Sequence, residues 1–212
     1  MSFIDEIKKR ASKEIKTIIL PESEDIRVLK ATEQVKKEGY AKIILIGDKE
    51  EILKKAEENN IDIADSKIVS PNEHPKYDEF VDILYNLRKH KGMTEEQAKE
   101  LVKDPVYFGM MMVKQGEADG LVSGAIHSTS DTLRPALQIL KTAPDTKLVS
   151  AFFVMVVPDC KYGENGIFIF GDSGLNENPN AKSLSEIAIS SSKSFRQLVE
   201  KEPKVAMLSY ST

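Results

Sequence analysis

The chain has 212 residues, 41% of them hydrophobic and 30% charged, which is typical of a globular protein that forms one large domain or one and a half. Its formal net charge is -4, and the 30 basic and 34 acidic residues are mixed along the chain. This pattern excludes a basic stripe for nucleic acid and a polybasic membrane anchor, so an anionic ligand would need a local binding site.

Cysteine use and hydropathy suggest where the protein resides. The single cysteine, Cys160, excludes an internal disulfide and a cysteine-rich metal cluster, and it fits a reducing cytosol. The first residues lack the apolar core of a signal peptide, and the apolar run at 148–157 is about half as long as a membrane-spanning helix. We therefore expect a cytoplasmic protein with neither nucleic-acid nor membrane partners.

Strand and helix patterns alternate over the first part of the chain. Pro21 ends the first strand, and Ser23 is expected to cap the helix that follows and ends near Gly39. Asp48 and Glu51 have capping-box spacing at the start of the next helix. The alternation predicts βαβ units and a mostly parallel sheet covered on both faces. In chain order we expect an N-terminal amphipathic helix, strands at 15–20, 42–46, 66–69 and 119–122, helices between the first three strands, and further helices at 77–89, from 94, and at 104–116.

The pattern changes after 142–145, which we interpret as a domain boundary. Apolar runs at 148–157 and 167–170, joined by a Gly- and Asn-containing turn, predict a β-hairpin, and a helix at 182–200 and a last strand at 205–208 follow. The expected fold is α/β, with a three-layer, mostly parallel sheet domain over 1–145 that carries the anion-binding motif and an incomplete second α/β domain over 146–212. Because the chain stops at the tip of a strand, where α/β proteins bind ligands, it looks truncated.

Several familiar catalytic motifs are missing from the sequence. There is no P-loop and no GxGxxG, and the three histidines lack metal-ligand spacing, so we expect no metal site. Gly171–Gly174 reads GDSG, like the nucleophile segment of serine proteases, but the third glycine and the histidine motif of those enzymes are absent. A tight turn after a strand is the better interpretation of that segment.

The segment 123–135, SGAIHSTSDTLRP, gathers hydroxyl groups beside one arginine. We expect Asp131 or Thr132 to cap a helix with Pro135 in its first turn, so that Arg134 projects from the helix start. A helix N-terminus and an arginine both favour an anion, chiefly phosphate. The alternative is structural: the hydroxyls form caps and turns, and Asp131 with Arg134 is only a surface pair. For His127 we favour a hydrogen-bonding role in the loop over the role of a general acid.

Several motifs, in chain order, resemble those of one known family. They are T-I-I-L-P-E at 17–22, L-R-K-H-K-G at 87–92, S-G-A-x-H-S-T-x-D-T-L-R-P at 123–135 and the terminal S-Y-S-T. Together they closely resemble the phosphate acetyltransferases over essentially the whole chain. The resemblance implies a cytoplasmic acyltransferase that moves an acetyl group reversibly between coenzyme A and inorganic phosphate. It also implies a homodimer of two-domain subunits with the isocitrate/isopropylmalate dehydrogenase-like fold.

The resemblance assigns roles to residues of this sequence. Arg134 matches the arginine of the family's T-x-R-P motif, which engages phosphate and offsets charge in the reaction, so it is the expected catalytic residue. Arg88 matches a second arginine implicated in substrate binding. Coenzyme A is a substrate, and no tightly bound cofactor is implied. The other expected substrate-binding residues are Ser128, Thr129, Ser209, Ser211 and Thr212.

The resemblance leaves the activity of the chain itself open. Family members continue beyond the position of Thr212 with the rest of a phosphate-contacting loop and with residues proposed to act on coenzyme A. The parent protein is therefore expected to be an enzyme, and the chain as given is expected to lack turnover. Phosphate butyryltransferase and a non-catalytic phosphate- or coenzyme-A-binding fragment remain as alternatives.

Overall fold

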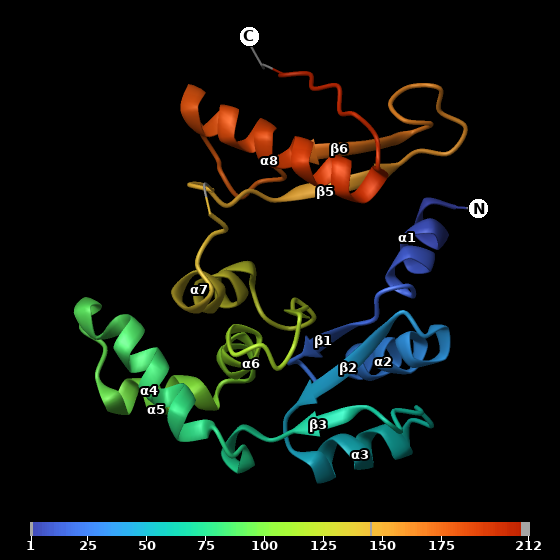
Figure 1. The fold of residues 1–212 in the computed structure, drawn as a ribbon. Coiled ribbons are helices and arrows are strands. Elements are labelled where there is room, and N and C mark those ends of the chain that lie inside the picture. Colours follow the sequence, from blue (N-terminus) through green and yellow to red (C-terminus); the bar gives the residue numbers. More distant parts are fainter. Residues whose placement is uncertain (1, 145, 209–212) are drawn as a thin grey trace. The chain divides into compact units, whose positions relative to one another are not determined.

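A computed structural model describes residues 2–144 and 146–208 (Figure 1). The chain divides into two compact units, Met1–Lys141 and Thr142–Thr212. The first unit contains a four-stranded sheet in the order β3-β2-β1-β4, with every neighbouring pair parallel. The expected α/β fold with a parallel sheet is therefore confirmed. The strands are β1 (Lys16–Leu20), β2 (Ala41–Ile46), β3 (Lys67–Val69) and β4 (Gly120–Leu121).

Helices cover both faces of this sheet (Figure 1). In β2, Ile43 and Leu45 pack into one apolar cluster with α2 and α3, whereas Ile44 and Ile46 pack into the other with α4, α5 and α6. The alternation follows from the two-residue period of a strand, and it makes a three-layer core. The helices of this unit are α1 (Phe3–Ala11), α2 (Ile26–Glu38), α3 (Lys49–Glu58), α4 (Tyr77–Arg88), α5 (Glu95–Lys103), α6 (Pro105–Lys114) and α7 (Thr129–Ile139), with short 3₁₀ turns at Pro71–Glu73 and Lys89–Lys91.

The caps explain most of the helix bounds. Asp48 accepts the Glu51 N–H at the start of α3, and Gly39 ends α2 with a left-handed backbone, φ 68°. The expected Ser23 cap is wrong, because Asp25 caps α2. Ser23 is instead buried, and its hydroxyl donates to the Leu20 carbonyl and accepts the Ile46 N–H, which ties the ends of β1 and β2 together.

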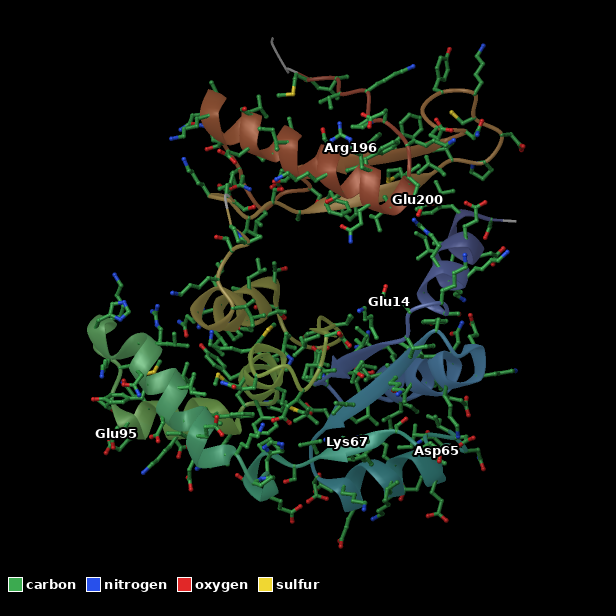
Figure 2. The ribbon with its side chains drawn as sticks, in the orientation of Figure 1. Glu14, Asp65, Lys67, Glu95, Arg196 and Glu200 are labelled. Carbon is green, nitrogen blue, oxygen red and sulfur yellow. The ribbon has the colours of Figure 1, made fainter. Side chains whose placement is uncertain are left out.

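The second unit contains an antiparallel hairpin of β5 (Phe152–Val156) and β6 (Ile167–Gly171), with α8 (Ala181–Val199) packed against β6. Helix α8 ends at Val199 with Glu200 as its C-cap, φ 57°, and Arg196 lies in its last turn (Figure 2). The Arg196 guanidinium donates to the Glu202 carboxylate at 3.0 Å. After β6, Asp172 accepts the N–H groups of Gly174 and Leu175, so the GDSG segment forms a tight turn.

The strand expected at 205–208 is wrong, because these residues form no strand. Val205 and Met207 are more than half exposed, and Leu208 is 90% exposed. A short apolar run becomes a strand only where a neighbouring strand pairs with it, and the described residues supply no such neighbour here.

Candidate functional site

The candidate site begins where β4 leaves the sheet beside β1. Strand β4 pairs in parallel with β1, and the Val122 N–H continues the pairing by donating to the Ile19 carbonyl. The loop from Ser123 to Ser128 therefore starts at the carboxyl edge of the sheet, which is where parallel α/β sheets commonly bind ligands.

Glu22, just after β1, holds this loop in place. Its side chain is 2% exposed, and its two carboxylate oxygens accept the backbone N–H groups of four successive loop residues, each at 2.8 Å. The donors are Gly124, Ala125, Ile126 and His127. Consecutive N–H groups that converge in this way form a concave anion site, and here an internal carboxylate already occupies it.

The Glu22 carboxylate also orients His127. The His127 Nδ1 lies 2.9 Å from Glu22 Oε1, and since an ionised carboxylate can only accept, Nδ1 carries the proton. Burial alone would raise the pKa of Glu22, but the backbone N–H groups and the His127 ring outweigh burial and hold this pKa far below its usual range. The hydrogen-bonding role expected of His127 is the one that the structure contains.

Arg27 supports the same loop from α2. Its guanidinium donates to the Ala125 carbonyl at 2.6 Å while it pairs with the Asp25 carboxylate, also at 2.6 Å. The segment after β1 thus contacts the loop twice, through an acceptor for its N–H groups and a donor for one of its carbonyls. Neither Glu22 nor Arg27 was identified from the sequence as a site residue. The available signal for Glu22 was its position directly after Pro21, as the last residue of the T-I-I-L-P-E motif.

Ser128 caps α7, three or four residues earlier than the cap expected from the sequence. Its hydroxyl accepts the Asp131 N–H and lies 2.6 Å from the Asp131 carboxylate. The expected cap at Asp131 or Thr132 is therefore wrong, and Pro135 lies inside the helix instead of in its first turn. The reason is that Ser128 is also a good capping residue and directly follows the part of the loop that Glu22 fixes.

Donors without acceptors gather at the start of α7. The N–H groups of Thr129 and Ser130 have no acceptor among the described residues, as is usual in the first turn of a helix. Arg134, one turn further along, is exposed and makes no hydrogen bond or ion pair within the described ranges. The alternative pairing of Asp131 with Arg134 is not formed among the described residues. The Asp131 carboxylate instead accepts the Ser128 hydroxyl; this hydrogen bond chiefly lowers the pKa of Asp131, and Arg134 adds to the effect by its charge.

Arg88 ends α4, which packs against α7, and it contributes a second cation near Tyr107 of α6. Its Nε is buried and has no hydrogen-bond partner in the described structure. The Tyr107 hydroxyl, which donates to Gln138 at 3.1 Å, is close enough to both arginines for their charges to act on its pKa. Burial raises the pKa of Tyr107, and Arg134 and Arg88 partly offset that rise. Two arginines from distant segments thus act on the same tyrosine by their charge. Ser209, Ser211 and Thr212 lie outside the described residues.

Other candidate sites carry less chemistry. A cavity of about 420 Å³ lies along β3, and three of its polar side chains pair with one another: Glu117 contacts both His74 and Lys76. None of the residues around the α7 start lines it. Over 2–144 and 146–208, no cluster of three or more metal-ligating side chains occurs, and no helix is long and apolar enough to cross a membrane.

Comparisons with known proteins cover nearly the whole chain. Residues 2–212 match the family described as Phosphate acetyl/butaryl transferase. A phosphate acetyltransferase from Acetivibrio thermocellus is 58% identical over 212 residues, which are 100% of this chain and 63% of that protein. A solved phosphotransacetylase structure from Streptococcus pyogenes has a TM-score of 0.88 at 37% identity, over 100% of this chain and 64% of that one. One from Staphylococcus aureus has a TM-score of 0.82 at 39% identity, over 93% and 58%. The chain therefore spans somewhat less than two thirds of the length of these relatives.

Proposed function

Because the chain belongs to the phosphate acetyl/butaryl transferase family, we propose that it is the phosphate-binding part of an enzyme that transfers an acetyl group between coenzyme A and inorganic phosphate. Acetyl is favoured over butyryl because the curated relatives matched here are named phosphate acetyltransferase. The activity is proposed for a protein of the full length of those relatives. Homodimeric assembly is part of the same proposal.

The observation that carries the proposal is the exposed Arg134, without a partner among the described residues, one turn along α7 from the free N–H groups of Thr129 and Ser130. A helix N-terminus and a guanidinium are complementary to a phosphate dianion, and charge-assisted hydrogen bonds of this type contribute about 1.5–3 kcal/mol each. The buried, unpartnered Nε of Arg88 supports a second contact to the same anion. Ser128 contributes by starting the helix, and Thr129 adds a hydroxyl.

The reaction requires positioning and charge stabilisation more than a protein nucleophile. The thiolate sulfur of coenzyme A attacks the acetyl carbonyl of acetyl phosphate, a C–S bond forms, and the C–O bond to phosphate breaks. Phosphate leaves with the electron pair of that bond and gains negative charge. Arg134 and Arg88 would offset this charge as it develops, which lowers the barrier without a covalent intermediate.

The test uses the chain joined to the part of the Acetivibrio thermocellus relative that lies outside the match, termed the extended protein. We expect it to form acetyl-coenzyme A from acetyl phosphate and coenzyme A without added metal, and to use butyryl phosphate poorly. Arg134→Ala should lower kcat/KM at least about tenfold, which corresponds to roughly 1.4 kcal/mol of transition-state stabilisation.

The matched control is Arg196→Ala, which removes an exposed arginine that pairs with Glu202. It should leave kcat/KM unchanged. Full activity of Arg134→Ala would remove the argument for the phosphate site, and a folded extended protein that forms no thioester would contradict the proposed reaction. If the 212-residue chain binds phosphate while the folded extended protein stays inactive, the non-catalytic binding alternative is favoured.

A further inference from the structure

Glu22 is a buried acid to which the proposed reaction gives no task. It lies two residues after the end of β1, yet it binds a loop that follows β4, more than 100 residues further along the chain. Burying a carboxylate costs free energy unless hydrogen bonds replace its hydration. Here they do, because five donors surround it: four backbone N–H groups and the His127 Nδ1.

The division of these donors between the two oxygens requires the ionised acid. Oε2 accepts from Gly124 and Ala125, and Oε1 accepts from Ile126 and from both the backbone and the ring of His127. A protonated acid or an amide carries hydrogen on one of its two terminal atoms. That hydrogen would point at the N–H groups that now contact this atom. An ionised carboxylate of this length is therefore the side chain that matches the loop.

We propose that Glu22 is a positioning residue of the phosphate site, and this inference rests on the function proposed above. By fixing the N–H and ring of His127, its carboxylate fixes the position of the next residue, Ser128, which caps α7. The direction of α7 sets where the free N–H groups of Thr129 and Ser130 and the Arg134 guanidinium lie. Arg27 supports the same loop through the Ala125 carbonyl.

The Glu22 charge also selects which N–H groups a phosphate can reach. The loop N–H groups of 124–127 would attract a phosphate if they were free, because they converge on one point. Glu22 fills that point and repels a second anion. Phosphate is thereby directed to the start of α7, where Arg134 can contact it.

Two parallel experiments test the inference, and the first does not depend on catalysis. In the 212-residue chain, titration with inorganic phosphate should shift the backbone amide NMR signals of Thr129 and Ser130 and leave those of Gly124 and Ala125 in place. In Glu22→Gln, the shifts at Thr129 and Ser130 should weaken and shifts at the loop amides should appear. If Glu22 only stabilised the fold, the folded fraction of Glu22→Gln would show the same phosphate-induced amide shifts as wild type.

The second experiment measures kinetics in the extended protein. Glu22→Gln should raise the KM for acetyl phosphate about tenfold and lower kcat, while the KM for coenzyme A changes little. Glu22→Asp, which keeps the charge on a side chain one methylene shorter, should recover part of the loss. The matched control Glu24→Gln changes a neighbouring exposed acid and should behave like wild type.

The outcomes separate the two proposals. An inactive, folded wild-type extended protein counts against the proposed reaction, and the NMR titration then decides the role of Glu22 by itself. If Glu22→Gln does not fold, Glu22→Asp decides. The inference would be overturned if the folded variant, Glu22→Gln or in its place Glu22→Asp, kept the wild-type phosphate shifts. In an active extended protein, the same variant would also have to keep the wild-type KM for acetyl phosphate.

Discussion

At the scale of single residues, hydrogen-bond satisfaction separates the groups that build the site from those left for a ligand. The loop N–H groups of 124–127 are occupied by Glu22, and the Ser128 hydroxyl is occupied by Asp131. Arg134 and the Arg88 Nε have no such partner among the residues described. The sequence indicates an anion-binding segment, but only the hydrogen bonds of the folded chain indicate which donors are available to an anion.

The ionised state of Glu22 predicts a pH-dependent stability. Its pKa in the folded chain lies well below the ordinary 4.5, so its stabilisation is fully present above that value and is lost as the pH falls below it. We expect the difference in unfolding free energy between wild type and Glu22→Gln to be largest near neutral pH and to shrink steadily below about pH 5. Urea unfolding at several pH values measures this difference, and a constant difference from pH 7 to pH 3 would contradict the assignment.

At the scale of elements, α6 approaches the sheet closely enough to position α7, which packs on it. Gly109 permits this approach, because a Cβ there would lie 2.5 Å from Leu121 Cδ1 and 3.1 Å from methyl groups of Ile19 and Ile46. The sequence predicts α6 correctly from its apolar residues and its Asp104-Pro105 start. The sequence did not predict how close the helix lies to the strands, because that depends on which strands it crosses.

Gly109→Ala tests this close packing. Although alanine favours a helix by itself, the added methyl must displace Leu121 and press on the buried Ile19 and Ile46, so we expect the variant to be destabilised by about 1–3 kcal/mol. Gly116→Ala is unsuitable as a control because Gly116 has a positive φ of 74°. Ala98→Gly, in the buried face of α5, offers a comparison. This variant loses helix propensity and the contacts of one methyl group, and it introduces no clash. A Gly109→Ala midpoint in urea equal to or above wild type would contradict the predicted clash.

At the scale of the molecule, the two units differ in how much apolar surface they bury. Both core clusters, from Ile19 to Ile139, lie within the first unit. Among the described residues of the second unit, Ile187 is the one fully buried large apolar side chain, while Phe153 and Phe170 are more than half exposed. Apolar burial is the main favourable term in folding, so the units should differ in stability.

A fragment of residues 1–141 is therefore expected to unfold cooperatively in urea. A fragment of residues 142–212 should show no cooperative transition and should bind a hydrophobic dye, because its hairpin and α8 bury too little apolar surface. Circular dichroism and dye fluorescence of the two fragments measure these properties. A sharp transition in the second fragment, or none in the first, would contradict this view of the core.

The sequence by itself determined the parallel α/β class and the order of strands and helices apart from the strand expected at 205–208, and it predicted an anion-binding segment at 123–135. These features depend on apolar periods and caps that act over a few residues, so local physical chemistry encodes them. The tertiary structure decided that β1 lies beside β4, and this adjacency brings Glu22 to a loop 102 to 105 residues away. It also decided that Ser128 caps α7 and that Arg88 and Arg134 both act on Tyr107 by their charge. Such contacts follow from sheet order and helix packing, which no local pattern specifies.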